Sequence, residues 1–138
     1  MSNRRIDSKA DVELFLAELK MILESDTFVV KRDLDILMKK KGEDPKDPCT
    51  TANTMATLEY DKNDVYEELK KLTIREYAET IIDDRDSTWP PFFVFYRNIQ
   101  SQNVYIKVKI RDRQSGKVFC VSFHFARYPV TNSLPYAN

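Results

Sequence analysis

Residue types that can act on a phosphodiester gather in the last third of the sequence. Tyr105 and Lys107 lie in one alternating segment, and His124, the only histidine, lies near the end of another. An imidazole with an unperturbed pKa of about 6.5 can accept or donate a proton near neutral pH. Lysine stabilises phosphate charge, and tyrosine stacks on a base or donates a hydrogen bond. These types suit RNA cleavage in which the 2′-hydroxyl attacks phosphorus, with no metal or other cofactor.

Each of these residues also has a purely structural interpretation. A single histidine at a strand end is often incidental, and alternating lysines commonly keep a strand from aggregating. Tyr105 can simply cover the apolar edge of a sheet. Because they are predicted to converge on one face, the functional interpretation is about as well supported as the structural one.

The net charge of zero conceals a segregation of charge along the chain. Residues 97–127 hold seven basic side chains and only one acidic side chain, Asp112. Residues 128–138 are uncharged, so residues 1–96 carry the compensating negative charge. We therefore expect a basic face for an anionic partner. Its candidate phosphate contacts besides Lys107 are Lys109, Arg111, Arg97 and Arg127.

Two alternating segments, 103–111 and 117–125, position these residues. They flank a turn that contains Ser115 and Gly116, a pattern typical of an antiparallel hairpin. The side chains expected to face the core are Val104, Ile106, Val108 and Ile110, together with Phe119, Val121, Phe123 and Phe125.

The strand register follows from the requirement that the apolar faces coincide. One register pairs Ile110 with Phe119, which places Tyr105 opposite His124. A shift by two residues places Lys107 opposite His124 instead. In either register one face gathers tyrosine, lysine and histidine.

The preceding sequence predicts mainly helices. Apolar residues repeat at helical spacing after Ser8, a good N-cap. Gly42 suits a helix C-terminus, and Asn63 and Thr73 are candidate N-caps. The expected elements are a helix from about residue 8 to 24, a short edge strand at 27–30, a helix at 34–41, a loop at 43–51, helices at 51–59, 64–72 and 74–82, and an aromatic strand at 92–96.

The acidic group Asp83, Asp84 and Asp86 suggests a site for a hard cation. It lacks the alternating spacing and the glycine of a calcium loop. We favour a solvated helix end, and we predict no metal site.

Composition predicts a cytoplasmic protein. No apolar run approaches the roughly 20 residues of a membrane span, and the polar start of the sequence does not resemble a signal peptide. Cys49 and Cys120 are far apart in sequence, which favours two reduced thiols over a disulfide framework.

The hairpin residues and an upstream segment carry a family resemblance. The runs 103–110 (NVYIKVKI) and 118–124 (VFCVSFH), with 69–77 (LKKLTIREY) before them, resemble the MqsR family of ribonuclease toxins. The resemblance implies a RelE-like fold, metal-independent cleavage of mRNA and neutralisation by a cognate antitoxin protein. Tyr105 matches an active-site tyrosine of that family, and His124 stands where a lysine is found.

The sequence thus predicts a single α+β domain over residues 1–138. An antiparallel sheet, about 92–127, carries helices from about 8–86 on one face, and 128–138 form a tail. The predicted function is an endoribonuclease toxin that acts on mRNA, with His124, Tyr105 and Lys107 in its active site. The alternatives are a non-catalytic nucleic-acid-binding domain or a protein-interaction module. The latter would present the aromatic residues Phe92, Phe93, Phe95 and Tyr96.

Overall fold

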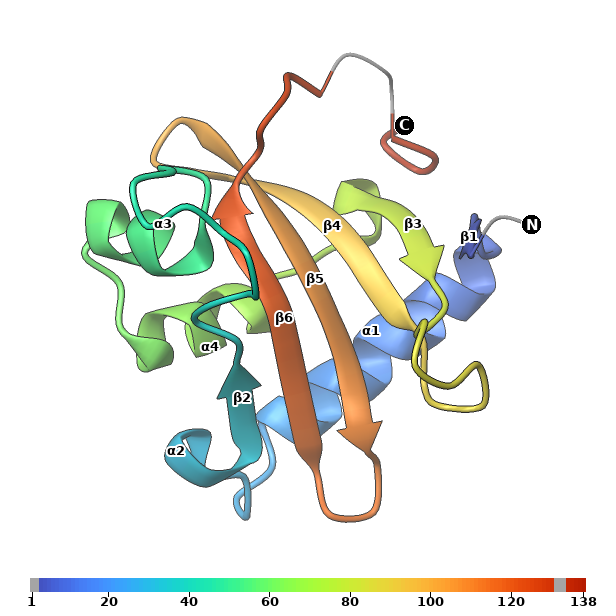
Figure 1. Ribbon diagram of the computed structural model, residues 1–138. Helices are drawn as coiled ribbons and strands as arrows, with labels where there is room; N and C mark the ends of the chain where they lie inside the picture. Colours follow the sequence, from blue (N-terminus) through green and yellow to red (C-terminus); the bar gives the residue numbers. More distant parts are fainter. Residues whose placement is uncertain (1–2, 131–133) are drawn as a thin grey trace.

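A computed structural model describes residues 3–130 and 134–138 (Figure 1). Within these residues six strands form one sheet in the order β1-β3-β4-β5-β6-β2. Neighbouring strands are antiparallel except for β2 and β6. The strands are β1 (Arg4–Arg5), β2 (Leu34–Ile36), β3 (Tyr77–Ile81), β4 (Phe92–Ile99), β5 (Gln102–Asp112) and β6 (Lys117–Phe125). The helices are α1 (Lys9–Leu23), α2 (Val30–Asp33), α3 (Thr51–Leu58) and α4 (Lys62–Lys70), with a 3-10 turn at Ile74–Glu76. The predicted α+β class is confirmed.

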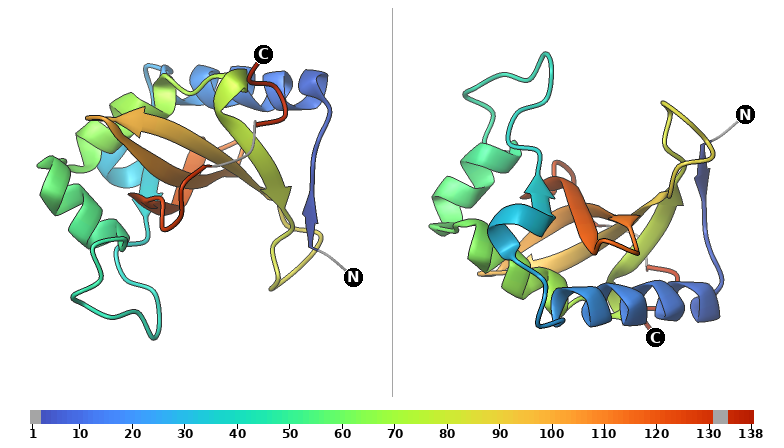
Figure 2. Two further views of the ribbon diagram at one scale, coloured as in Figure 1. Left: turned by 90° about the horizontal axis from the view of Figure 1, so that it is seen from above. Right: turned by 90° about the horizontal axis from the view of Figure 1, so that it is seen from below.

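Helix α1 lies across one face of the sheet, and the loops 37–50 and 82–91 project from the other side (Figure 2). The Ser8 side chain accepts a hydrogen bond from the amide of Asp11, so the predicted N-cap is confirmed. The apolar stripe of α1 packs on β4, where the rings of Phe15 and Phe93 stack with centroids 3.8 Å apart. Burial of this stripe is what fixes the helix, since propensity alone holds a helix this short only weakly. No helix in the described part of the chain is both long and apolar enough to span a bilayer.

Helix α3 closes the free edge of β6 beyond the three-residue strand β2. The amide of Phe123 donates to the Thr51 hydroxyl at 3.2 Å, and the amide of Phe125 donates to the Thr54 hydroxyl at 3.0 Å. Both threonines are buried. Backbone donors that would be exposed at an edge strand are thus satisfied by side chains of α3.

The predictions of a strand at 27–30 and of a helix at 34–41 are both wrong, because the structure has a short helix first and a strand after it. Residues 30–33 form α2, and the strand β2 follows it. The Asp33 carboxylate accepts a hydrogen bond from the amide of Val29 and pairs with Lys117 of β6, which ends the helical turn beside the sheet. Leu34 is then buried opposite Val118 in the parallel pairing. Tertiary pairing decides between helix and strand for such short apolar runs.

The predicted helix at 74–82 is also wrong. Thr73 caps only the 3-10 turn, and β3 follows immediately. Tyr77 faces the core fully buried, and β3 pairs with β4 through a bulge. The helix before it begins at the N-cap Asp61 rather than Asn63. Strands β2 and β3 therefore come from residues that were predicted to be helical, and no element was predicted for the residues of β1.

The predicted hairpin is confirmed, and a bulge at Val121 changes half of its register. Tyr105 lies opposite His124 as in the first of the two predicted registers. Beyond the bulge Val108 faces Cys120, and Ile110 faces Val118 instead of Phe119. The extra residue sends Val118 and Cys120 into the main core. Phe119 and Val121 turn to the opposite face, where they pack with a second apolar cluster that contains Ile81, Phe92 and Val94.

The tail beyond β6 returns to the start of the chain. The Tyr136 ring stacks on Tyr77 with centroids 6.0 Å apart, and its hydroxyl donates to the carbonyl of Asp7. The described end of the tail is therefore tied to the segment that enters α1.

Candidate functional site on the open face of the sheet

Three rings from neighbouring strands lie together on the sheet face opposite α1. The rings of Tyr105 and His124 stack with centroids 5.0 Å apart and an interplanar angle of 14°. Tyr96 of β4 meets Tyr105 edge-on at 5.5 Å. Antiparallel pairing places these residues in one row across β4, β5 and β6. The row is half-buried, so each ring keeps some exposed surface.

The hydrogen bonding of His124 assigns its tautomer. Its Nδ1 lies 3.0 Å from the carbonyl oxygen of Phe125, which can only accept, so Nδ1 carries the proton. In the neutral ring Nε2 then keeps its lone pair and can act as a base. Burial lowers the pKa of His124, and the charges of Lys40 and Arg127 lower it further. The imidazole is therefore held in the form that accepts a proton.

Lys107 lies beside this row and has no carboxylate within ion-pair distance among the described residues. Its ammonium is 4.9 Å from the centre of the Phe92 ring. Burial lowers the pKa of Lys107, as does the nearby charge of Lys40. A half-buried ammonium without a carboxylate partner is suited to an external anion.

Lys40 is a second cation at this site, and it comes from the loop after β2. Its ammonium donates to the Ser122 hydroxyl at 2.6 Å, and Ser122 lies opposite Lys107 in the hairpin. Burial lowers the pKa of Lys40. Lys40, His124 and Arg127 are among the residues that line a pocket of about 250 Å³. Sequence reasoning placed Lys40 in a helix and missed it; the basic run 39–41 before Gly42 was the available signal.

Burial and the charge of Glu79 raise the pKa of Tyr105 to about 12. The phenol therefore keeps its proton near neutral pH and can donate a hydrogen bond or stack. It cannot serve as a base there.

The remaining predicted phosphate contacts already hold acidic partners. Lys109 was expected to be exposed, but it is buried and its ammonium lies 2.8 Å from the Asp83 carboxylate. Asp83 is correspondingly buried, so the predicted solvated helix end is wrong there. Arg97 faces the helices and binds Glu68 at 2.8 Å. The exposed pairs are Arg111 with Asp35 at 3.0 Å and Arg127 with Asp47 at 2.7 Å.

The expected basic face is thus largely neutralised by acids that lie earlier in the chain, between Asp35 and Asp83. Lys107 and Lys40 are left as the cations of the site without ion pairs in the described chain. Phe92, Phe93 and Phe95, expected as a partner surface, are buried. No three His, Cys, Asp or Glu side chains converge as a metal site within residues 3–130 and 134–138.

Comparisons of the chain with protein-family models, curated proteins and solved structures found no match. The resemblance to the MqsR family therefore stays a prediction from the quoted residues.

Proposed function

We propose that the protein is an endoribonuclease that cleaves single-stranded RNA without a metal ion. The observation that carries the proposal is the arrangement at His124. Its Nδ1 is committed to the Phe125 carbonyl, and its ring lies next to Tyr105 in a region that holds Lys107 and Lys40. A base and two cations without ion pairs can promote transesterification of RNA, and a stacking surface can position its bases.

The proposed reaction begins when Nε2 of His124 accepts the proton of a 2′-hydroxyl. The 2′-oxygen attacks the adjacent phosphorus, and the bond from phosphorus to the 5′-oxygen breaks. Lys107 and Lys40 stabilise the charge of the phosphorane, and an ammonium with a lowered pKa donates a proton to the leaving 5′-oxygen. The products are a 2′,3′-cyclic phosphate and a 5′-hydroxyl. Tyr105 holds a base by stacking or donates to a phosphate oxygen.

The test is cleavage of a long mixed-sequence RNA in EDTA by the parent protein and by His124→Gln. Loss of a general base is expected to slow cleavage by roughly 10²- to 10⁴-fold. Arg113→Gln is the matched control, because this exposed arginine lies at the hairpin tip and its ion pair among the described residues is with Glu18. Equal cutting by the parent and the His124 variant would remove His124 from the mechanism. If the parent cleaves neither free nor ribosome-bound RNA, the proposed endoribonuclease activity is refuted.

The pH dependence gives a second readout. Because the pKa of His124 is lowered, the neutral base persists below the ordinary histidine pKa of about 6.5. As the pH is lowered, kcat/KM is therefore expected to fall only below about 6.5, where His124 becomes protonated. The residual kcat/KM of His124→Gln is expected not to show this fall.

The biological role we propose is that of a toxin in a cytoplasmic toxin–antitoxin pair, with mRNA as its substrate. Support for this role comes from the resemblance of the hairpin sequence. Expression of the parent is expected to arrest bacterial growth, and the His124→Gln protein is expected to be tolerated. An antitoxin would cover the open face, so its binding should protect RNA from cleavage.

A non-catalytic RNA-binding domain is the second candidate. The row of Tyr96, Tyr105 and His124 is a sheet-borne platform on which bases can stack without any reaction. Binding of RNA by the parent without cleavage under any of the conditions above would favour this candidate.

A further inference from the structure

A second aromatic and cationic pocket lies further along the same face of the sheet. Its volume is about 320 Å³, and its lining includes Trp89, Arg85 and Arg111. Trp89, the only tryptophan of the chain, is 45% exposed. Tryptophan side chains are mostly buried on average, so an indole with this much exposed surface is available to contact a ligand.

Charged groups surround this indole. The Arg85 guanidinium lies 5.2 Å from the centre of the Trp89 ring. Arg111 packs over Phe119 at 4.1 Å, and its side chain is 45% exposed. Arg85 and Arg111 keep exposed guanidinium groups, although each also pairs with an aspartate. An aromatic surface next to exposed arginines complements a base and its phosphate.

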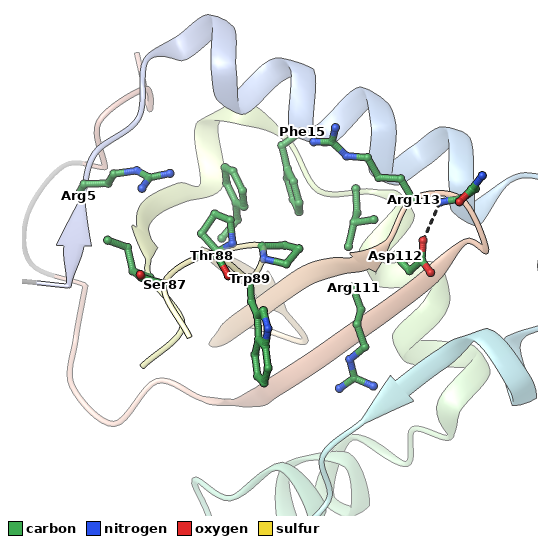
Figure 3. A pocket seen from close by; sticks show the side chains of 14 residues that line it. Arg5, Phe15, Ser87, Thr88, Trp89, Arg111, Asp112 and Arg113 are labelled. Atoms are coloured by element: carbon green, nitrogen blue, oxygen red, sulfur yellow. Dashed lines mark hydrogen bonds between the residues drawn. The ribbon is translucent and has the colours of Figure 1, made fainter. Parts of the chain in front are cut away.

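The position of the pocket connects it to the site at His124. Tyr105, Lys107, Lys109 and Arg111 alternate along β5, so their side chains leave the same face of the strand. Four residues of a strand span about 13 Å, which places Lys109 and the Trp89 pocket that far from Tyr105. Figure 3 shows Trp89 and Arg111 extending to the side of β5 away from α1, whereas Phe15 lies on the side of α1. The pocket drawn in Figure 3 is a larger one of about 690 Å³. Of the predicted site residues, only Arg111 lines it.

The loop that carries Trp89 is fixed by local hydrogen bonds. The Trp89 amide donates to the Asp86 carbonyl at 3.0 Å, and the Asp86 side chain accepts from the amide of Thr88 at 2.9 Å. The loop is also anchored to the sheet through Asp83 and Lys109. The backbone that carries the indole is therefore fixed at the end of the open face.

We propose that the Trp89 pocket is a base-binding subsite for single-stranded RNA that runs along β5 from the site at His124. The inference rests on the proposed function for the identity of its ligand. A base stacks on Trp89 while Arg85 and Arg111 contact the neighbouring phosphates. The substrate must then be an extended single strand that reaches from Tyr105 to Trp89.

The intrinsic fluorescence of the protein provides the test, because Trp89 is its only tryptophan. The probe is 2′-O-methyl RNA of about ten nucleotides, a length within the site sizes of single-strand binders. It lacks the attacking hydroxyl and is not cut. Titration is expected to quench the fluorescence. A dinucleotide is too short to span from Tyr105 to Trp89, so it is expected to quench only at concentrations well above those at which the longer RNA saturates.

Variants separate stacking from general binding, measured by anisotropy of labelled RNA. Trp89→Ala is expected to bind the longer RNA roughly 5- to 100-fold more weakly, as for loss of one stacked base. Met21→Ala is the control, because Met21 is an exposed apolar residue on α1, across the sheet from the open face. Arg111→Gln is expected to reduce the salt dependence of binding.

The outcomes distinguish the subsite from the enzyme. RNA that binds without quenching, and equally well to Trp89→Ala, overturns the subsite even if cleavage occurs. Trp89-dependent binding without cleavage overturns the proposed reaction and leaves the subsite standing. Absence of any RNA binding overturns both.

Discussion

The buried pair of Asp83 and Lys109 leads to a quantitative prediction for stability. Their side chains are each 3% exposed and lie 2.8 Å apart, whereas Arg85, the other partner of Asp83, is 62% exposed. In Asp83→Ala, Arg85 can turn to water, but the ammonium of Lys109 stays buried with the Pro90 carbonyl as its remaining acceptor. An uncompensated buried charge of this kind costs about 3–5 kcal/mol. Urea unfolding at pH 7 measures this loss in the free energy of unfolding.

A set of companion variants tests the reasoning. Lys109→Met is expected to cost about 1–3 kcal/mol, because Asp83 keeps Arg85. The double variant removes the buried charge and should be more stable than Asp83→Ala alone. Asp35→Ala, which breaks an exposed pair with Arg111, should cost about 0–1 kcal/mol. A double variant less stable than Asp83→Ala would refute the buried-charge account.

The sign of the pH dependence follows from the carboxylate. Hydrogen bonds from Arg85 and Lys109 hold the pKa of Asp83 well below its usual range. A lowered pKa stabilises the fold above the unfolded value of about 3.9, and this stabilisation is lost as the pH falls below it. The stability difference between the parent and Asp83→Ala should therefore be constant above about pH 5 and narrow in more acidic urea titrations.

Three further predictions concern separate parts of the molecule. Lys40→Met should raise the pKa of His124, because it removes a nearby positive charge; NMR titration of the single histidine reports this directly. Thr54→Val should cost about 1–3 kcal/mol in thermal or urea unfolding, because a buried β6 amide loses its acceptor. Cys120 is buried and its pKa is raised to about 12, so a thiol reagent should modify only the partly exposed Cys49 until the protein unfolds.

The alternation of residues in the hairpin predicted its strands and, through the buried face, limited the register to a few choices. The observed Tyr105–His124 pair belongs to one of the two registers considered. The alternation did not predict the bulge at Val121, because residues 118–121 are all apolar and either alternate pair of them could face the core. The short segments 27–41 and 74–82 were misassigned for a related reason. Their few apolar residues fit either period, and pairing with β6 or β4 decided between them.

The charges of the site were harder to predict than its aromatic rings. Net charge along the chain indicated a basic face, but Asp83 lies 26 residues from Lys109 and Asp47 lies 80 from Arg127. Such long-range pairs depend on where loops return to the sheet. Lys40 reaches the site by the same means, through a loop that follows a parallel edge strand.

The closure of the sheet edge by α3 restricts how any protein partner can recognise this molecule. Strand addition requires a run of unpaired backbone groups. The outer edge of β6 is instead hydrogen-bonded to β2 and to the threonine hydroxyls of α3. At the other edge β1 is only two residues long. A partner must therefore recognise side chains rather than extend the backbone ladder. The selectivity for such a partner would then be encoded in the exposed side chains, and point substitutions could change it while the sheet stays the same.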